Sequence, residues 1–368
     1  MREYLITAFV AAAVTYLLTP FVRRGAELIG AYTPVRDRDV HTIPTPRLGG
    51  LAIFGGVGAA LLVASRLPTL HRVFDTSEIR GVFFGGLLLV AIGAADDKWG
   101  LDALTKLAGQ ILAAGVMVLE GVQILYFPVS HNGALSLGPD LGVPLTVIFV
   151  VVTINAVNFI DGLDGLAAGV VAIASLSFFA YSYELSVVQH FDRATTPTLV
   201  TAVLTGACLG FLPHNFNPAR VFMGDSGSML LGLMLSSSAV TLTGQLDPSA
   251  TTAVGLFPTL IPLLLPLAVL AVPFVDLVLA IARRTRTGQA PWAPDKLHLH
   301  HRLLRLGHSH ARAVLIMYLW SALIAGGAVT IAFAHDRPLL VLSGYCVAAA
   351  VLVVASSIPR LRHHHTGG

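Results

Sequence analysis

The chain has 368 residues, of which 55% are hydrophobic and only 12% are charged. A water-soluble globular domain carries about twice that share of charged residues, so the composition excludes that class and indicates an integral membrane protein. The formal net charge of +3 is small, and we expect membrane lipids and no nucleic acid around the protein.

The apolar residues form about eleven stretches of about 17–25 residues, each long enough to cross ~30 Å of hydrocarbon as a helix. The alternating pattern of membrane β-strands is absent from the sequence, so helices are expected throughout. We predict an all-α polytopic membrane protein with about 11 transmembrane helices, folded as a single integral membrane domain over residues 1–368. The predicted spans are 5–22, 48–65, 79–95, 104–122, 141–160, 165–183, 198–216, 226–244, 255–282, 313–334 and 339–358.

The basic residues predict the orientation of these spans. Of the 23 Lys and Arg residues, 16 lie in the odd-numbered connections and the C-terminal tail, five of them, including Arg47, in the first connection. Cytoplasmic connections are enriched in Lys and Arg. We therefore expect the odd-numbered connections and the C-terminus in the cytoplasm and the N-terminus outside.

Four polar motifs lie in odd-numbered connections, so all four are predicted on the cytosolic face. Asp96-Asp97 ends the third stretch, and Asp161-Gly-Leu-Asp164-Gly follows the fifth. Phe222-Met-Gly-Asp225 lies between the seventh and eighth stretches, and His298-Leu-His300-His301 lies between the ninth and tenth. Acids and imidazoles on one face are typical of metal-assisted chemistry at a membrane surface.

The two acidic motifs are read as a cation site. Two adjacent acids at a helix end, as at Asp96-Asp97, repel one another unless a cation or proton intervenes; a solvated helix end is the alternative. Asn158, Asp161 and Asp164 are each three residues apart, so one helical turn would place them on one face. Such oxygen ligands suit a hard cation or a hydroxyl-rich ligand; a polar loop is the alternative.

The motif around Asp225 favours a phosphate or a metal that carries phosphate. Pro218 blocks continuation of the seventh helix, and Asp225 or Ser226 can cap the eighth. Glycines beside a helix N-terminus suit an anion, whereas a simple capping Asp is the alternative reading.

The ninth connection combines three histidines with upstream arginines, including Arg283. The spacing lacks the usual zinc pattern and has no cysteine partners. Imidazoles and guanidinium groups bind phosphates, and a positively charged cytoplasmic loop is the alternative. Acids, amides, imidazoles and guanidinium groups on one surface together suit Mg²⁺ with a pyrophosphate substrate.

In their order, these motifs resemble the polyprenyl-phosphate N-acetylhexosamine-1-phosphate transferases, the membrane enzymes of the MraY and WecA type. The resemblance runs from about Pro44 to Leu304. It implies a cytosolic active-site face in a bacterial inner (plasma) membrane and transfer of a sugar phosphate from a UDP-N-acetylhexosamine to polyprenyl (decaprenyl or undecaprenyl) phosphate, which releases UMP and starts a cell-envelope glycan. It also implies Mg²⁺, with Mn²⁺ as an alternative metal, and it is compatible with a homodimer.

The resemblance also implies roles for individual residues. Metal binding falls to Asp225, with Asn158 or a neighbouring acid assisting, and Asp96 is the candidate base toward the lipid phosphate with Asp97 as its acidic partner. Asp161 and Asp164 complete the catalytic set. Substrate binding involves Asn215 and Phe222 at the uracil ring, and Lys106, Arg283, His298, His300 and His301 near the phosphates.

Two departures from the peptidoglycan branch favour the WecA-like branch, whose donor is usually UDP-N-acetylglucosamine. Leu299 interrupts that branch's run of three histidines, and Ile43 stands where it carries a Lys. A phospho-MurNAc-pentapeptide transferase remains the enzymatic alternative. An ion-coupled transporter is the non-enzyme alternative, disfavoured because the acids gather at one face instead of lining a path through the bilayer.

Overall fold

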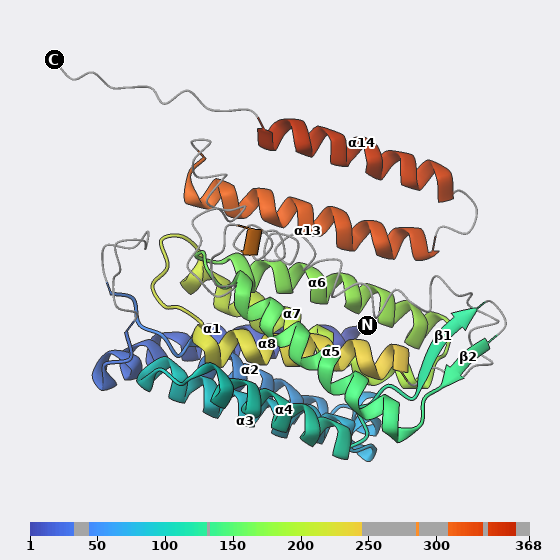
Figure 1. Ribbon diagram of the computed structural model, residues 1–368, viewed down its shortest axis with the longest axis horizontal. Helices are drawn as coiled ribbons and strands as arrows, with labels where there is room; N and C mark the ends of the chain where they lie inside the picture. Colours follow the sequence, from blue (N-terminus) through green and yellow to red (C-terminus); the bar gives the residue numbers. More distant parts are fainter. Residues whose placement is uncertain (33–43, 131–132, 245–284, 287–307, 334–337, 358–368) are drawn as a thin grey trace.

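The structure is a computed structural model that describes residues 1–32, 44–130, 133–244, 285–286, 308–333 and 338–357. Over these residues the chain is a bundle of long helices with one small hairpin (Figure 1). The helices are α1 (Arg2–Ile29), α2 (Gly49–Ala64), α3 (Glu78–Trp99), α4 (Ala103–Leu119), α5 (Pro139–Ile160), α6 (Leu166–Tyr183), α7 (Thr195–Asn215), α8 (Gly224–Gly244), α13 (His310–Phe333) and α14 (Pro338–Ser357).

A described helix overlaps each of ten of the eleven predicted stretches, and the ninth, 255–282, lies outside the described residues. Among the described helices, α1, α3, α5, α6, α7 and α13 are long and apolar enough to cross a membrane. The count of about eleven spans therefore stays a prediction. Some helices extend beyond the predicted apolar runs, as α1 does by continuing to Ile29 where the predicted span ends at residue 22.

A short hairpin of β1 (Tyr126–Ser130) and β2 (Gly133–Ser136) joins α4 to α5 and was missed from the sequence. The two strands pair in antiparallel fashion, with Tyr126 opposite Ser136. Such a two-stranded hairpin is marginal by itself, and its short strands leave little periodic signal in the sequence. It precedes the N-terminus of α5, at the end of that helix remote from Asn158.

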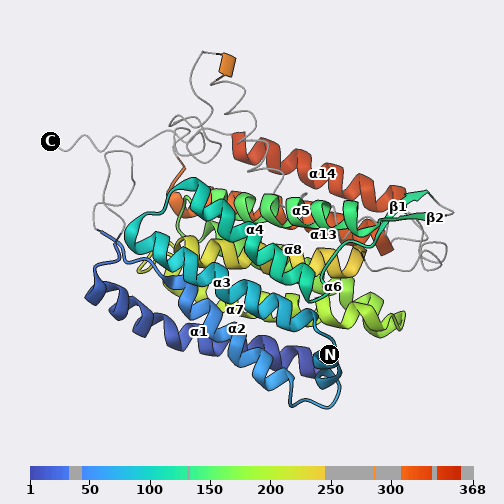
Figure 2. The same cartoon turned by 60° about the horizontal axis from the view of Figure 1, so that its bottom comes forward.

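Helix α8 lies at the centre of the bundle, where it packs against α2, α3, α5 and α7. Helices α1, α2 and α3 lie on one side of it, and α13 and α14 lie on the other (Figures 1 and 2). The hydroxyls of Ser236, Ser237 and Ser238 are buried, and each donates to a backbone carbonyl one turn earlier in α8. Because these polar groups are satisfied within the helix, α8 can carry them inside the protein.

Small residues let the outer helix α1 approach α7 closely. A Cβ atom added at Gly210 in α7 would lie 2.2 Å from the carbonyl oxygen of Ala12 in α1, and one added at Gly206 would lie 2.0 Å from that of Ala8. Close backbone approach at glycine is the usual means of packing helices in lipid, where burial of apolar surface gives little advantage. The α1–α7 contact therefore depends on the absence of side chains at these two positions.

We predict that Gly210→Ala lowers the thermal stability of the detergent-solubilised protein, because the new methyl group must push α1 away at a cost of about 1–3 kcal/mol. Gly115→Ala in α4 is the matched control, since nothing lies within 4 Å of a Cβ atom there. Equal melting temperatures for the two variants would contradict this packing.

Candidate active site

The turn between α3 and α4 brings a lysine back over the acidic pair. Gly100 ends α3 in the left-handed conformation, with φ of 70°. Asp102 then caps α4 by accepting from the N–H groups of its first turn at 2.9 and 3.0 Å. Asp96 accepts from the N–H of Leu101 at 2.7 Å, and its other oxygen lies 3.3 Å from Nζ of Lys106. Local chain geometry thus pairs Asp96 with Lys106.

Asp97 is a cap for another helix. Its buried carboxylate accepts from the N–H of Asp225 at 2.9 Å, and from the N–H and the hydroxyl of Ser226 at 3.2 and 2.9 Å. Gly224 has φ of 69°, and a Cβ atom there would collide with the Asp97 carboxylate. These contacts satisfy free N–H groups at the start of α8 and place a negative charge at its positive end. Asp97 therefore fixes where Asp225 lies.

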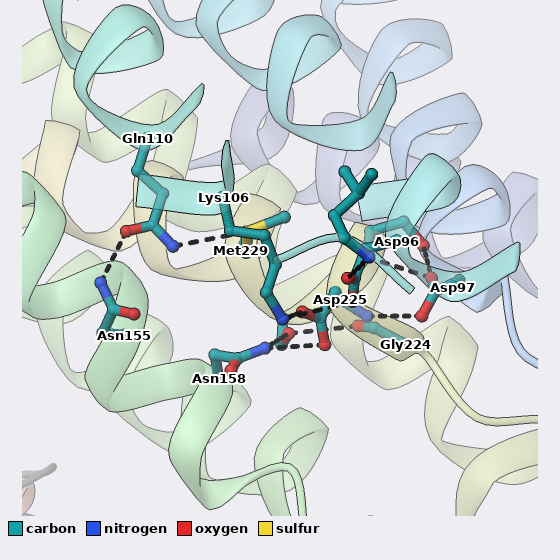
Figure 3. A network of polar contacts seen from close by, with 12 residues as sticks. Asp96, Asp97, Lys106, Gln110, Asn155, Asn158, Gly224, Asp225 and Met229 are labelled. Atoms are coloured by element: carbon teal, nitrogen blue, oxygen red, sulfur yellow. Dashed lines mark hydrogen bonds and ion pairs between the residues drawn. The ribbon is translucent and has the colours of Figure 1, made fainter. Parts of the chain in front are cut away.

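Asp225 is the centre of the polar network in Figure 3. One of its oxygens lies 2.9 Å from Nζ of Lys106, and the other accepts from the side-chain amide of Asn158 at 3.1 Å. The same amide nitrogen donates to the hydroxyl of Ser228 at 2.8 Å. Lys106 therefore bridges Asp225 and Asp96. Helices α3, α4, α5 and α8 each contribute at least one residue to this network.

The prediction that Asn158, Asp161 and Asp164 share one helical face is wrong. Helix α5 ends at Ile160, Asp161 has already left the helical conformation, and Gly165 takes φ of 77°. Gly165, in the left-handed conformation, directly precedes α6, so the residues between the two helices form a turn. Only Asn158 therefore keeps its helical position, pointing toward Asp225 (Figure 3).

Asp164 faces a different loop. It is buried, and one of its oxygens accepts from the Asn217 amide at 3.0 Å and from the N–H of Ala219 at 2.9 Å. A buried carboxylate with such bonds holds a loop in place. The structure therefore places Asp164 as a support for the segment between α7 and α8.

Asp161 lies among acids in the connection after α5. Burial, together with the negative charges of Asp225 and Asp97, raises the pKa of the Asp161 carboxyl to about 8, against the opposing positive charge of Arg47. The ionised form is thus disfavoured where acids outnumber cations. Such a region is suited to an added cation.

Asn215, at the end of α7, joins two loops. Its side-chain oxygen accepts from the N–H of Gly165 at 3.1 Å, and its amide nitrogen donates to the carbonyl of Val221 at 3.0 Å. The residue is only 2% exposed. These bonds direct its amide into the protein, where it supports the loops on both sides.

Phe222 is partly exposed at the start of the segment that leads into α8. Its N–H donates to the carbonyl of Pro46 at 2.8 Å, and its carbonyl accepts from the N–H of Gly49 at 3.0 Å. The first connection thus pairs with this segment and fixes the backbone that presents the aromatic ring.

Two further contacts at the site were not singled out from the sequence. One turn deeper than Lys106 and Asn158, the amide of Asn155 donates to Gln110 at 2.6 Å (Figure 3). The hydroxyl of Tyr318 in α13 donates to the carbonyl of Gly165 at 2.5 Å. Gln110 is four residues after Lys106, a spacing that predicts the same face of α4. No local sequence pattern predicts the contact between α13 and Gly165.

Comparison with known proteins identifies the family of this chain. The family model of glycosyl transferase family 4 matches residues 79–243, which contain most of the network. Decaprenyl-phosphate N-acetylglucosaminephosphotransferase of Mycolicibacterium smegmatis is 48% identical over 372 aligned positions, which cover 100% of this chain and 91% of that protein. The chain belongs to the polyprenyl-phosphate N-acetylhexosamine-1-phosphate transferases.

Other members of this transferase family are more distant. A probable undecaprenyl-phosphate N-acetylglucosaminyl 1-phosphate transferase of Bacillus subtilis is 34% identical over 86% of this chain and 81% of its own length. A phospho-N-acetylmuramoyl-pentapeptide-transferase of Desulforudis audaxviator is 33% identical over 88% of this chain and 97% of its own length. Both branches considered from the sequence are thus related to this transferase.

The structure brings together six of the thirteen residues that the sequence singled out. Asp96, Lys106, Asn158 and Asp225 form one network, which Asp97 supports, and Asp161 lies close enough to be affected by its charges. Asp164 and Asn215 support the adjoining loops. The predicted phosphate-binding residues Arg283, His298, His300 and His301 lie outside the described residues.

We predict different effects for two replacements of Asp97. Asp97→Ala removes the side-chain acceptor of the Asp225 and Ser226 N–H groups and should lower stability by about 1–2 kcal/mol. Asp97→Asn keeps one acceptor, and because Asn is also a good cap, this variant should retain most of the stability and measurable turnover. Thermal melting and UMP release would be measured on both. Wild-type stability combined with complete inactivity in Asp97→Asn would show that the charge itself is required for catalysis.

Proposed function

We propose that the protein transfers N-acetylglucosamine-1-phosphate from UDP-N-acetylglucosamine to polyprenyl phosphate and releases UMP. The observation that carries this proposal is the network of Asp96, Lys106, Asn158 and Asp225, built from four helices at one end of the bundle. It lies in a chain that is 48% identical over its full length to a decaprenyl-phosphate N-acetylglucosaminephosphotransferase. Acids and an ammonium group side by side are suited to phosphoryl transfer.

Mg²⁺ fits the donor chemistry of this site. Among the described side chains, no group of three or more His, Cys, Asp or Glu is spaced to hold a metal alone. Mg²⁺ usually takes one or two carboxylates and completes its shell with water and substrate phosphates. Asp225 would hold it, with the Asn158 side-chain oxygen or Asp96 assisting. When bound, Mg²⁺ or Mn²⁺ would screen the phosphate charges and polarise a phosphoryl oxygen.

The charge balance supports a divalent cation. The carboxyl groups of Asp96, Asp97, Asp161, Asp164 and Asp225 outnumber Arg47 and Lys106, the cations that interact with them among the described side chains. A bound divalent cation would reduce that excess of negative charge.

In the proposed reaction an oxygen of the lipid phosphate attacks the β-phosphorus of the UDP-sugar. A new P–O bond forms to that phosphorus, and its bond to the bridging oxygen breaks, so that UMP leaves with this oxygen. Asp96 takes the remaining proton of the lipid phosphate when that phosphate is not fully ionised. Lys106 stabilises charge on the phosphates from its place between Asp96 and Asp225. We favour this direct attack over a phospho-Asp intermediate because one site can hold both substrates.

Phe222 supplies the proposed uracil contact. Its ring is partly exposed, its backbone is held on both sides, and a base can stack on an aromatic face for ~1–3 kcal/mol. The family resemblance places Asn215 at the uracil. Here it would act indirectly, because its bond to the Val221 carbonyl fixes the backbone next to Phe222. Arg283, His298, His300 and His301 remain proposed phosphate-binding residues.

The donor and the location follow from the same comparison. Ile43 and Leu299 depart from the peptidoglycan branch, so we favour UDP-N-acetylglucosamine over UDP-MurNAc-pentapeptide. We place the protein in the bacterial inner membrane with the network facing the cytoplasm, because the sequence has most of its Lys and Arg residues in the connections that carry the motifs and in the C-terminal tail. A homodimer remains a prediction from the family resemblance.

Purified protein in detergent provides the direct test of this function. UMP release should require UDP-N-acetylglucosamine, polyprenyl phosphate and Mg²⁺ together, and should stop when the metal is chelated. Faster turnover of UDP-MurNAc-pentapeptide, or failure to release UMP from either donor, would overturn the proposal.

We predict that Asp225→Asn nearly abolishes turnover while the protein stays folded. An amide keeps the shape of the side chain, but it loses the charge that would meet the metal, at a cost of several kcal/mol in the transition state. Turnover and melting temperature would be measured over a range of Mg²⁺ concentrations. Substantial activity with an unchanged Mg²⁺ dependence would rule out the metal assignment.

We predict that Asp96→Asn keeps residual turnover, with a defect that shrinks as the pH rises from about 6 to 9. The second pKa of a phosphate monoester lies near 6, so at higher pH the acceptor needs less help from a base. Exchange of labelled UMP into the UDP-sugar, measured without lipid acceptor, separates the two mechanisms. Acceptor-independent exchange that disappears in Asp96→Asn would favour a phospho-Asp intermediate.

A further inference from the structure

We propose that Arg47 anchors the diphosphate of the nucleotide-sugar donor, between the aromatic ring of Phe222 and the carboxylates at the start of α8. The inference rests on the proposed function and assigns a donor-binding role to a residue of the first connection. From the sequence alone, Arg47 is only one of the basic residues that predict a cytoplasmic first connection.

The backbone around Arg47 is fixed from two directions. On one side, Pro46 pairs with Tyr32, and the N–H of Arg47 donates to the carbonyl of Ala31 at 3.0 Å. On the other side, Pro46 and Gly49 both bond to the backbone of Phe222, at 2.8 and 3.0 Å. Arg47 is therefore held between the end of α1 and the segment that leads into α8.

The turn after Arg47 is packed directly against the first residues of α8. A Cβ atom added at Gly50 would lie 2.2 Å from the backbone nitrogen of Gly227, so no side chain could be accommodated there. The N–H of Gly50 also donates to the carbonyl of Met223 at 2.9 Å. Because the backbone of Arg47 is already fixed, less conformational entropy is lost when its side chain binds a ligand.

The side chain of Arg47 extends toward the acids but is not required to satisfy Asp97. One guanidinium nitrogen lies 4.0 Å from the Asp97 carboxylate, beyond hydrogen-bonding distance, and the Arg47 side chain remains 32% exposed. Asp97 already accepts three bonds from Asp225 and Ser226. The guanidinium group of Arg47 thus lies close to the acids of the site and keeps part of its surface exposed.

Its location matches the diphosphate of the donor. Phe222 is three residues before Asp225, so a base stacked on Phe222 and a metal at Asp225 would place the diphosphate between them. Arg47 flanks this interval, because both Pro46 and Gly49 bond to Phe222 while its side chain approaches Asp97. A guanidinium group is suited to two parallel bonds with a phosphate. Lys106, which pairs with Asp96 and Asp225, flanks the acids from α4.

The test compares Arg47→Gln and Arg47→Lys with a matched control, Arg80→Gln. Arg80 forms a 3.1 Å ion pair with Glu120 near the start of α3, at the end of that helix remote from Asp96. The KM values for UDP-N-acetylglucosamine and for polyprenyl phosphate would be measured separately, together with binding of UMP and of UDP-N-acetylglucosamine by calorimetry.

Arg47→Gln should raise the KM and the Kd for UDP-N-acetylglucosamine by about 10- to 100-fold, the loss expected when bonds to a charged group are removed. The KM for polyprenyl phosphate should change less than about twofold, because its phosphate is proposed to lie on the Asp96 side of the network and not against Arg47. Arg47→Lys should recover part of the donor affinity, since it keeps the charge without the planar pair of donors. Arg80→Gln should leave both KM values unchanged.

Three results would overturn the role of Arg47. They are a fall in kcat with unchanged donor KM, a rise in KM for polyprenyl phosphate alone, or unchanged donor binding in a folded Arg47→Lys combined with lower thermal stability. Failure of the proposed function is distinguishable, because in that case the wild-type protein itself would not bind UDP-N-acetylglucosamine or release UMP from it.

Discussion

The hydrogen bonds that Asp225 and Ser226, in the first turn of α8, donate to the Asp97 carboxylate are the contact on which the rest of the site depends. They join the last turn of α3 to the first turn of α8 and satisfy helix N–H groups that would otherwise be buried without partners. Gly93 and Gly224 make this possible, because a side chain at either position would collide with α8 or with Asp97 itself. Once α8 is fixed in this way, Asp225 faces Lys106 and Asn158. The hydrogen bonds to Asp97 therefore determine the position of Asp225, the proposed metal ligand.

The polar residues at this end of the bundle fall into two sets, one buried and bonded to backbone groups and one partly exposed. Asp97, Asp164 and Asn215 are buried and bond to backbone groups of neighbouring segments, so they hold the loops in place. Asp225, Lys106 and Phe222 keep part of their surface exposed, so a substrate can reach them. Most of the supports are themselves acids or amides. Loss of activity on mutation would therefore not by itself identify a catalytic residue here.

Much of the fold could be predicted from the sequence, because the lengths of apolar runs and the parity of the connections require no tertiary information. The same parity argument brought Asp96, Asn158 and Asp225 to one side. It could not show that Asp97 caps α8 or that Asn215 joins two loops, because these contacts link residues that are 128 and 50 positions apart. The helical spacing of Asn158, Asp161 and Asp164 gave a wrong prediction because α5 ends at Ile160, so Asp161 and Asp164 lie in the turn before α6.

The central claim is that Asp225, held by the start of α8, is the main protein ligand of a divalent cation. Mn²⁺ binding to the detergent-solubilised protein, followed by electron paramagnetic resonance, tests it without relying on turnover. The account predicts one bound Mn²⁺ per wild-type chain in the presence of UDP-N-acetylglucosamine, competed by Mg²⁺ and lost in a folded Asp225→Asn variant. Undiminished Mn²⁺ binding in that variant would contradict the account.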